Sequence, residues 1–152
     1  MSSETTQDQT RIDDLRIKAV RPLITPAILE EWLPAPLAAQ KLVESSRKAI
    51  SQVLHGQDDR LVVVVGPCSI HDRDQALEYA RLLKAEAEKY AQDLLIVMRV
   101  YFEKPRTTVG WKGYINDPDM DDSFAINKGL GLARRLLLEV LDICLPVGTE
   151  FL

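Results

Sequence analysis

A cysteine, a group of cations and a glutamate each follow an apolar stretch of this sequence. Cys68 lies three residues after the apolar run 61–65, LVVVV, and directly behind a Gly-Pro pair. Its thiolate could bind a metal or act as a nucleophile, or the thiol could be packed as a small apolar group. The sequence contains no Cys-x-x-Cys pair, which argues against a redox role. The position of Cys68 leaves these interpretations open.

The segment 99–112 carries the strongest chemical signal. It contains four cations and one acid, Glu103, so a chain of net charge −4 has a local charge of +3 there. Hydroxyls accompany the cations, and the set is Arg99, Lys104, Arg106, Thr107, Thr108 and Lys112. Forked guanidiniums, an ammonium and hydroxyl donors are the groups that bind the phosphate of a small molecule. The segment therefore predicts an anion site.

Two acidic features are less specific. Glu150 lies at the end of a third predicted strand, which begins at residue 147. Its carboxylate there could orient a substrate, bind water or form a salt bridge. The stretch 115–123, INDPDMDDS, resembles a calcium loop only loosely, because its spacing and its lack of glycine do not fit an EF-hand. Turn formation and a helix N-cap at Asp122 or Ser123 explain this stretch better.

The elements that must position these groups alternate between helices and strands. Apolar residues at helical spacing indicate the helices, and continuous apolar runs indicate the strands. The predicted helices span 39–54, 74–90 and 123–143, and the predicted strands span 61–65, 94–100 and a stretch from residue 147. Continuous apolar runs are typical of strands buried on both faces of a parallel sheet. This α/β pattern predicts a doubly wound sheet or a (β/α) barrel, with chemistry at the carboxyl ends of the strands.

The two ends of the sequence differ from this regular part. Residues 1–36 predict an arm, because their start is polar and 13–36 contains four prolines, which prevent a long helix. The arm could be a flexible leader, but Ile28, Leu29 and Trp32 are costly to leave in water, so we expect it to dock on another surface. A barrel needs roughly 250 residues, and a domain does not normally finish within an apolar strand. We therefore expect residues 37–152 to be a truncated barrel domain.

The composition, 46% hydrophobic and 28% charged, is that of an ordinary globular domain. No apolar run approaches the roughly 20 residues of a membrane span, and the polar N-terminus lacks the pattern of a secretory signal. We therefore expect a cytoplasmic location and no membrane partner. The net charge of −4 argues against nucleic acid as a partner. Two cysteines are too few for a disulfide framework.

Two longer motifs, GPCSIHD at 66–72 and MRVYFEKPRTTVGWKGYINDPDMDDSF at 98–124, resemble the N-terminal part of a known family. The family is the bacterial type I 3-deoxy-D-arabino-heptulosonate 7-phosphate (DAHP) synthases, in particular their feedback-regulated group. The resemblance implies the first third, β-α-β-α-β, of a (β/α)8 TIM barrel preceded by an N-terminal arm and helix. It also implies a transferase that condenses phosphoenolpyruvate with erythrose 4-phosphate, the first step of the shikimate pathway to aromatic amino acids.

The resemblance implies a role for each matching residue. Cys68 would be one ligand of a divalent metal, which could be Mn, Fe, Co or Zn. Arg99 and Lys104 would contact phosphoenolpyruvate, and Lys104 would be catalytic, stabilising charge or passing a proton to the new alkoxide. Further contacts would come from Arg106 and Thr107, to the phosphate of erythrose 4-phosphate, and from Glu150, beside phosphoenolpyruvate.

The resemblance also implies regulation and assembly. Asp13 and Asp14 match a region that forms subunit contacts and the effector site, so an aromatic amino-acid effector and a homo-oligomer are expected of the full-length protein. The family's other metal ligands, a His, a Glu and an Asp, come from later strands that these 152 residues do not contain. We therefore expect a fragment that is inactive by itself. The alternative is a non-catalytic fragment that binds a phosphate ligand or a partner subunit.

Overall fold

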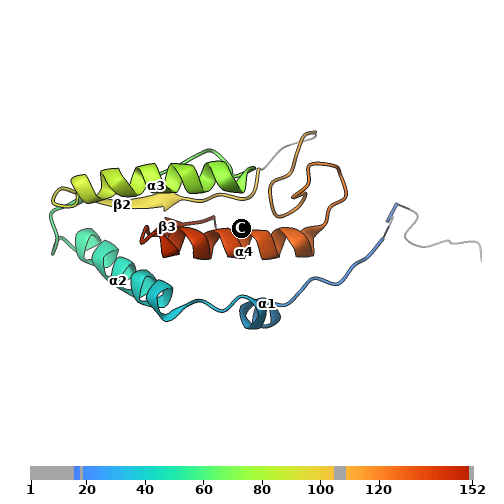
Figure 1. Cartoon of the computed structure of the whole chain (residues 1–152), viewed down its shortest axis with the longest axis horizontal. Helices are drawn as coiled ribbons and strands as arrows, with labels where there is room; N and C mark the ends of the chain where they lie inside the picture. The colour runs from blue at the N-terminus through green and yellow to red at the C-terminus, as the bar shows by residue number, and fades with distance from the viewer. Residues whose placement is uncertain (1–15, 18, 105–108, 151–152) are drawn as a thin grey trace, which may run out of the picture.

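The computed structural model describes residues 16, 17, 19–104 and 109–150. Helices and strands alternate along the chain after two initial helices (Figure 1). Their order is α1 (Pro26–Trp32), α2 (Leu37–Leu54), β1 (Leu61–Val65), α3 (Arg73–Lys89), β2 (Leu94–Arg99), α4 (Ile126–Asp142) and β3 (Val147–Gly148). The predicted α/β class is confirmed, and the predicted boundaries lie within a few residues of those observed.

The three strands form one parallel sheet in the order β1-β2-β3. Val65 of β1 is paired with Met98, and Arg99 of β2 is paired with Gly148. Because all three strands run in the same direction, their carboxyl ends lie at one edge of the sheet. The residues that follow the strands are therefore brought to that edge, as the sequence pattern predicts.

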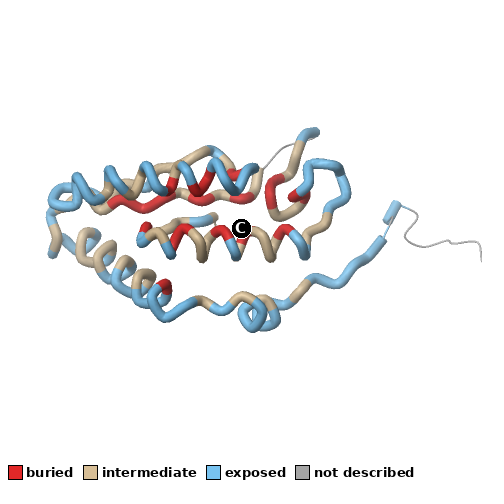
Figure 2. The backbone as a smooth tube through the Cα atoms, viewed as in Figure 1, coloured by how far each residue is buried: buried red, intermediate tan, exposed pale blue. Residues whose placement is uncertain are grey.

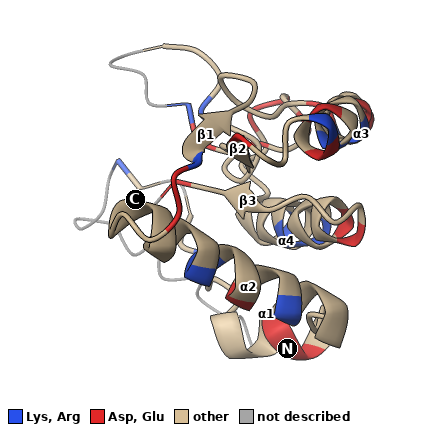
Figure 3. Ribbon diagram, turned by 90° about the vertical axis from the view of Figure 1, so that its left-hand side faces the viewer, with Lys and Arg blue, Asp and Glu red and all other residues tan. Residues whose placement is uncertain are grey.

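The hydrophobic core lies between this sheet and the helices α3 and α4. Both helices are on the same side of the sheet (Figure 3), and buried positions gather along β2 and on turns of the two helices (Figure 2). Met98 of β2, Ala80 of α3 and Val140 of α4 are fully buried in one cluster. The apolar stripes of α3 and α4 thus face the sheet, which is why amphipathic spacing in the sequence identifies them. Among the described helices none is long and apolar enough to cross a membrane.

Strand β1 is less buried than its apolar sequence predicts. Leu61 is 64% exposed and Val64 is 58% exposed, so burial on both faces is wrong for this strand in the described part of the chain. The reason is that β1 lies at the edge of the sheet, where β2 is its one partner among the described strands. In the described part of the chain, α3 and α4 lie on one side of the sheet (Figure 3).

Helix α4 begins later than predicted. The expected N-cap at Asp122 or Ser123 is wrong, because the residue before the helix is Ala125, which makes no side-chain cap. Asp122 and Phe124 instead adopt positive φ angles of 60° and 50°. These turns end the acidic stretch and redirect the chain before the first helical residue.

The arm runs along α4 and is hydrogen-bonded to it. The side chain of Asn127 accepts from the backbone N–H of Ile24 at 2.9 Å and donates to the carbonyl of Pro22 at 3.0 Å. Arg134 donates from Nε to the carbonyl of Leu33 at 2.7 Å. Trp32, whose docking is predicted, is 69% exposed in this single chain.

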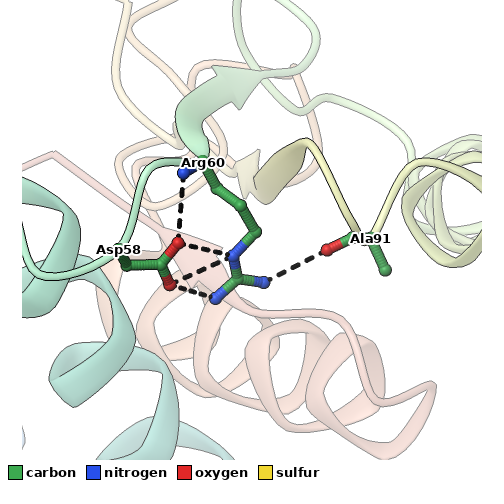
Figure 4. A network of polar contacts seen from close by, with 3 residues as sticks. All are labelled: Asp58, Arg60 and Ala91. Atoms are coloured by element: carbon green, nitrogen blue, oxygen red, sulfur yellow. Dashed lines mark hydrogen bonds and ion pairs between the residues drawn. The ribbon is translucent and has the colours of Figure 1, made fainter.

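An ion pair stabilises the opposite edge of the sheet, where the strands begin (Figure 4). Arg60, just before β1, donates to both carboxylate oxygens of Asp58, with Nη2 2.6 Å from Oδ2. The same guanidinium donates to the carbonyl of Ala91 at 3.4 Å, near the start of β2. The pairing lowers the pKa of Asp58. These contacts join the segments that enter β1 and β2.

Candidate active site

The predicted site residues that the structure describes lie at the carboxyl edge of the sheet. Cys68 follows β1, Arg99 ends β2, and Glu150 follows β3. Lys104, in the loop after β2, donates from Nζ to Sγ of Cys68 at 2.8 Å. The parallel sheet thus brings Cys68 of the first motif into contact with Lys104 of the cationic segment.

Gly66 allows the end of β1 to lie directly against Arg99. A Cβ at this position would stand 2.3 Å from the carbonyl oxygen of Arg99 and 3.0 Å from its Cβ. The first distance is far shorter than ordinary van der Waals contact, which begins at 3.4 Å, and the second is also shorter. The glycine is therefore required by the space between the strands, and any larger residue would move Arg99.

The side chain of Arg99 is held by an aromatic ring. Its guanidinium carbon lies 4.0 Å from the ring centroid of Tyr101, which is well within cation–π range. The carbonyl of Tyr101 accepts from the backbone N–H of Ile70 at 2.7 Å, so the ring is anchored to the loop that carries Cys68. Within the described residues, the guanidinium of Arg99 makes no hydrogen bond or ion pair.

Glu150 fixes the end of β3 to the chain that leaves β2. Its Oε1 accepts from the backbone N–H groups of Phe102 at 2.7 Å and Glu103 at 2.6 Å, and its Oε2 accepts from the hydroxyl of Thr149 at 2.8 Å. Burial acts to raise the pKa of Glu150, but these donors and its own backbone N–H favour the carboxylate and lower the pKa. Among the described residues Glu150 therefore pairs with backbone and not with an arginine.

Glu103 is a second carboxyl group at the same edge. Burial, followed by the negative charge of Glu150, raises its pKa, and a hydrogen bond from the side-chain amide of Asn116 partly opposes that shift. An antiparallel bridge to Gly113 fixes the backbone of Glu103, and the next residue, Lys104, donates its N–H to the carbonyl of Lys112 at 3.1 Å. Two neighbouring carboxyls thus have pKa values that are shifted in opposite directions.

Sequence reasoning missed Tyr101 and Glu103 as parts of this edge. A signal existed for both. Tyr101 is two residues beyond Arg99 on an extended chain, where alternate side chains share a face. Glu103 is the only acid in the cationic segment 99–112.

Four predicted residues lie outside the described part of the chain. They are Arg106 and Thr107 of the proposed phosphate site, and Asp13 and Asp14 of the proposed regulatory site. The described residues also contain no group of three or more His, Cys, Asp or Glu side chains that could hold a metal ion. One thiol does not make a metal site. The described residues therefore do not form one by themselves.

The sequence and the fold both match known proteins. The chain is 59% identical over 140 residues to the Phe-sensitive phospho-2-dehydro-3-deoxyheptonate aldolase of Escherichia coli K12, which covers 92% of this chain and 40% of that protein. It is 55% identical over 141 residues to the phospho-2-dehydro-3-deoxyheptonate aldolase of Amycolatopsis methanolica, which covers 93% of this chain and 70% of that protein. The solved structure of the Francisella tularensis phospho-2-dehydro-3-deoxyheptonate aldolase superposes with a TM-score of 0.86 at 54% identity, covering 90% of this chain and 40% of that one.

The chain spans 40% of the length of the E. coli and F. tularensis proteins and 70% of the A. methanolica protein. Residues 35–152, which begin just before α2, match the DAHP synthetase I family. This range contains Cys68, Arg99, Lys104 and Glu150 and therefore the whole described edge. The chain belongs to the DAHP synthetase I family.

Proposed function

We propose that this chain supplies the phosphoenolpyruvate-binding part of a DAHP synthase, which condenses phosphoenolpyruvate with erythrose 4-phosphate in the shikimate pathway. One observation carries the proposal: Arg99 and Lys104 both lie at the carboxyl edge of the sheet, and no described residue accepts a hydrogen bond from the guanidinium of Arg99. A guanidinium with free N–H groups matches a carboxylate or phosphate bidentately. Phosphoenolpyruvate carries both groups.

The proposed fold of the whole protein is a (β/α)8 TIM barrel. The three parallel strands, with α3 and α4 on one side, have the arrangement of consecutive β/α units. The open face and the free edge at β1 would then be covered by further strands of the barrel. The exposed Leu61 and Val64 support this proposal, because apolar strand residues are normally buried.

The proposed catalytic residue is Lys104. In the condensation, the enol carbon of phosphoenolpyruvate forms a bond to the aldehyde carbon of erythrose 4-phosphate, and the aldehyde oxygen becomes an alkoxide. The ammonium of Lys104 can give a proton to that oxygen; water then adds to the carbon that bears the phosphate, and the bond from that carbon to the phosphate oxygen breaks, which releases phosphate and leaves a ketone. Arg99 would bind phosphoenolpyruvate, with Glu150 beside it, while Arg106 and Thr107 would hold the phosphate of erythrose 4-phosphate.

Cys68 is proposed as one ligand of a divalent metal, which could be Mn, Fe, Co or Zn. The described residues contain no group of three or more His, Cys, Asp or Glu side chains that could hold such an ion. What the described contact shows is that Sγ of Cys68 accepts from Lys104. The thiol and the proposed catalytic ammonium are therefore neighbours.

Regulation by an aromatic amino acid is proposed for the whole protein, because the E. coli relative is named as Phe-sensitive. The arm, with Asp13 and Asp14, is proposed to take part in it and in homo-oligomer contacts. A cytoplasmic location is proposed for the same protein.

A non-catalytic phosphate-binding fragment is the second candidate. The observation that favours it is that the cationic edge is assembled while the described residues hold no metal group. Such a fragment would bind phosphoenolpyruvate without turning it over. Binding and turnover must therefore be measured separately.

Titration calorimetry with phosphoenolpyruvate tests the proposed site. We expect binding by the 152-residue chain, weakened about tenfold or more by Arg99→Ala, because hydrogen bonds between charged groups are lost. Lys89→Ala removes the same charge at the far end of α3, and we expect it to have no effect. Equal binding by Arg99→Ala and the unchanged chain would overturn the proposal.

A parallel assay follows phosphate release from phosphoenolpyruvate and erythrose 4-phosphate with Mn²⁺ present. We expect no turnover by these 152 residues, because their described part holds one proposed metal ligand. Turnover would show that the chain is competent alone. It would also exclude the non-catalytic candidate.

A further inference from the structure

The contact between Arg99 and Tyr101 leaves the N–H donors of the guanidinium available. The ring face of Tyr101 holds the guanidinium at 4.0 Å, whereas no described oxygen accepts from it. A carboxylate in the same place would occupy the donors of the fork. An aromatic face attracts the cation through its quadrupole and uses none of those donors.

The two acids at this edge are already occupied. Glu150 accepts from two backbone N–H groups and the hydroxyl of Thr149, and Glu103 accepts from Asn116. Neither forms an ion pair with Arg99 in the described part of the chain. The ring of Tyr101 is therefore the group that determines where the guanidinium lies.

The backbone of Tyr101 is held on both sides. Val100 and Phe102, its neighbours, are buried, and Phe102 stacks with Tyr114 at 6.3 Å between ring centroids. The carbonyl of Tyr101 accepts from Ile70, and the N–H of Val100 donates to Gly148 at 2.9 Å. All three strand ends thus fix the position from which the ring reaches Arg99.

We infer that Tyr101 is a positioning residue that orients Arg99 toward the anionic substrate while leaving its N–H donors free. The inference rests on the proposed function, because it gives Arg99 a phosphoenolpyruvate anion to bind. Holding the cation in place beforehand reduces the entropy lost when the anion binds. The hydroxyl of Tyr101 makes no hydrogen bond to any described residue, so the ring alone carries the role.

Substitutions of Tyr101 separate orientation from packing. We expect Tyr101→Leu to weaken phosphoenolpyruvate binding by roughly 3- to 30-fold, the range of a cation–π contact. Tyr101→Phe keeps the ring and should restore binding. The chain also offers a matched control, because Lys89 lies over the ring of Tyr90 at 4.9 Å, away from the site. Tyr90→Leu removes that ring and should leave binding unchanged.

Calorimetry should be combined with an NMR measurement of the Arg99 side chain. The ring should shift the Nε–Hε signal of Arg99 in the unchanged chain and in Tyr101→Phe, and the shift should disappear in Tyr101→Leu. In the Arg99→Ala background, Tyr101→Leu should cause no further loss of binding, because the ring acts through the guanidinium.

The possible outcomes distinguish this inference from the proposed function. Binding that is lost in Arg99→Ala but unchanged in Tyr101→Leu would overturn the positioning role and leave the proposed function standing. A further loss from Tyr101→Leu without Arg99 would also overturn it, since the ring would then act by another route. Absence of phosphoenolpyruvate binding by the unchanged chain would overturn both.

Discussion

Replacement of Gly66 by alanine should disturb the fold and the candidate site together. The added Cβ would stand 2.3 Å from the carbonyl oxygen of Arg99, whereas ordinary contact begins at 3.4 Å. The end of β1 must therefore move by about 1 Å, and the obstacle is backbone that has no alternative rotamer. Overpacking of this kind costs roughly 1–3 kcal/mol of unfolding free energy. We expect the upper half of that range for Gly66→Ala.

A matched control lies in α4. A Cβ at Gly131 meets no atom within 4 Å, and the residue lies inside the helix. Alanine there should raise the free energy of unfolding by about 0.5–1 kcal/mol, because glycine in a helix interior loses more backbone entropy on folding. The same chemical change is thus expected to have opposite signs at Gly66 and Gly131.

Urea unfolding followed by circular dichroism measures both variants, and calorimetry with phosphoenolpyruvate shows whether Arg99 has moved. Gly66→Ala should unfold at lower urea concentration than the unchanged chain and bind more weakly. A Gly66→Ala protein as stable as the unchanged chain would refute the reasoning. It would mean that β1 and β2 can separate at their carboxyl ends without cost.

The remaining predictions concern charge. In Glu150→Gln we expect the pKa of Glu103 to fall toward its ordinary value in a ¹³C NMR titration, because one cause of its raised pKa is removed; an unchanged Glu103 would contradict this. Folding lowers the pKa of Glu150, so its contribution to stability is present above the ordinary carboxyl pKa and is lost as the pH falls through the depressed value. The urea midpoint of Glu150→Gln should therefore fall less on acidification than that of the unchanged chain. Asp58→Asn should lower the urea midpoint at pH 7, because the Arg60 pair is lost, and the difference should shrink as the pH falls through the lowered pKa of Asp58. Phosphoenolpyruvate binding should survive Asp58→Asn, since the pair lies at the opposite edge of the sheet, and a loss of binding would argue against that separation.

The apolar periodicity of the sequence predicted the strands and the principal helices because burial decides them. Five consecutive apolar residues at 61–65 are typical of a strand, and the observed β1 has those bounds. The exposure of Leu61 and Val64 was not predictable in this way, because the pattern reports what a strand prefers and not what covers it. The start of α4 was also misplaced, since Asp122 has the chemistry of an N-cap but adopts a left-handed conformation.

The candidate site was predictable in its residue types but not in its pairings. The cationic segment and Cys68 were identified from their places after apolar runs, and parallel topology brings them together. Which groups touch depends on distances of a few tenths of an ångström across different strands. The contact between Lys104 and Cys68 and the backbone pairing of Glu150 arise only from the register of the folded sheet.

The pairing of Glu150 explains how a cationic edge can stay available to a ligand. A carboxylate beside guanidinium and ammonium groups would normally neutralise them. Here the carboxylate of Glu150 accepts hydrogen bonds from the N–H groups of Phe102 and Glu103, which lower its pKa. The carboxylate therefore holds the end of β3 to the chain after β2. Arg99 is left to the ring of Tyr101, which binds the cation without using its donors. Glu150 and Tyr101 thus have the same effect: each stabilises the carboxyl edge of the sheet and leaves the N–H groups of Arg99 available to an anion.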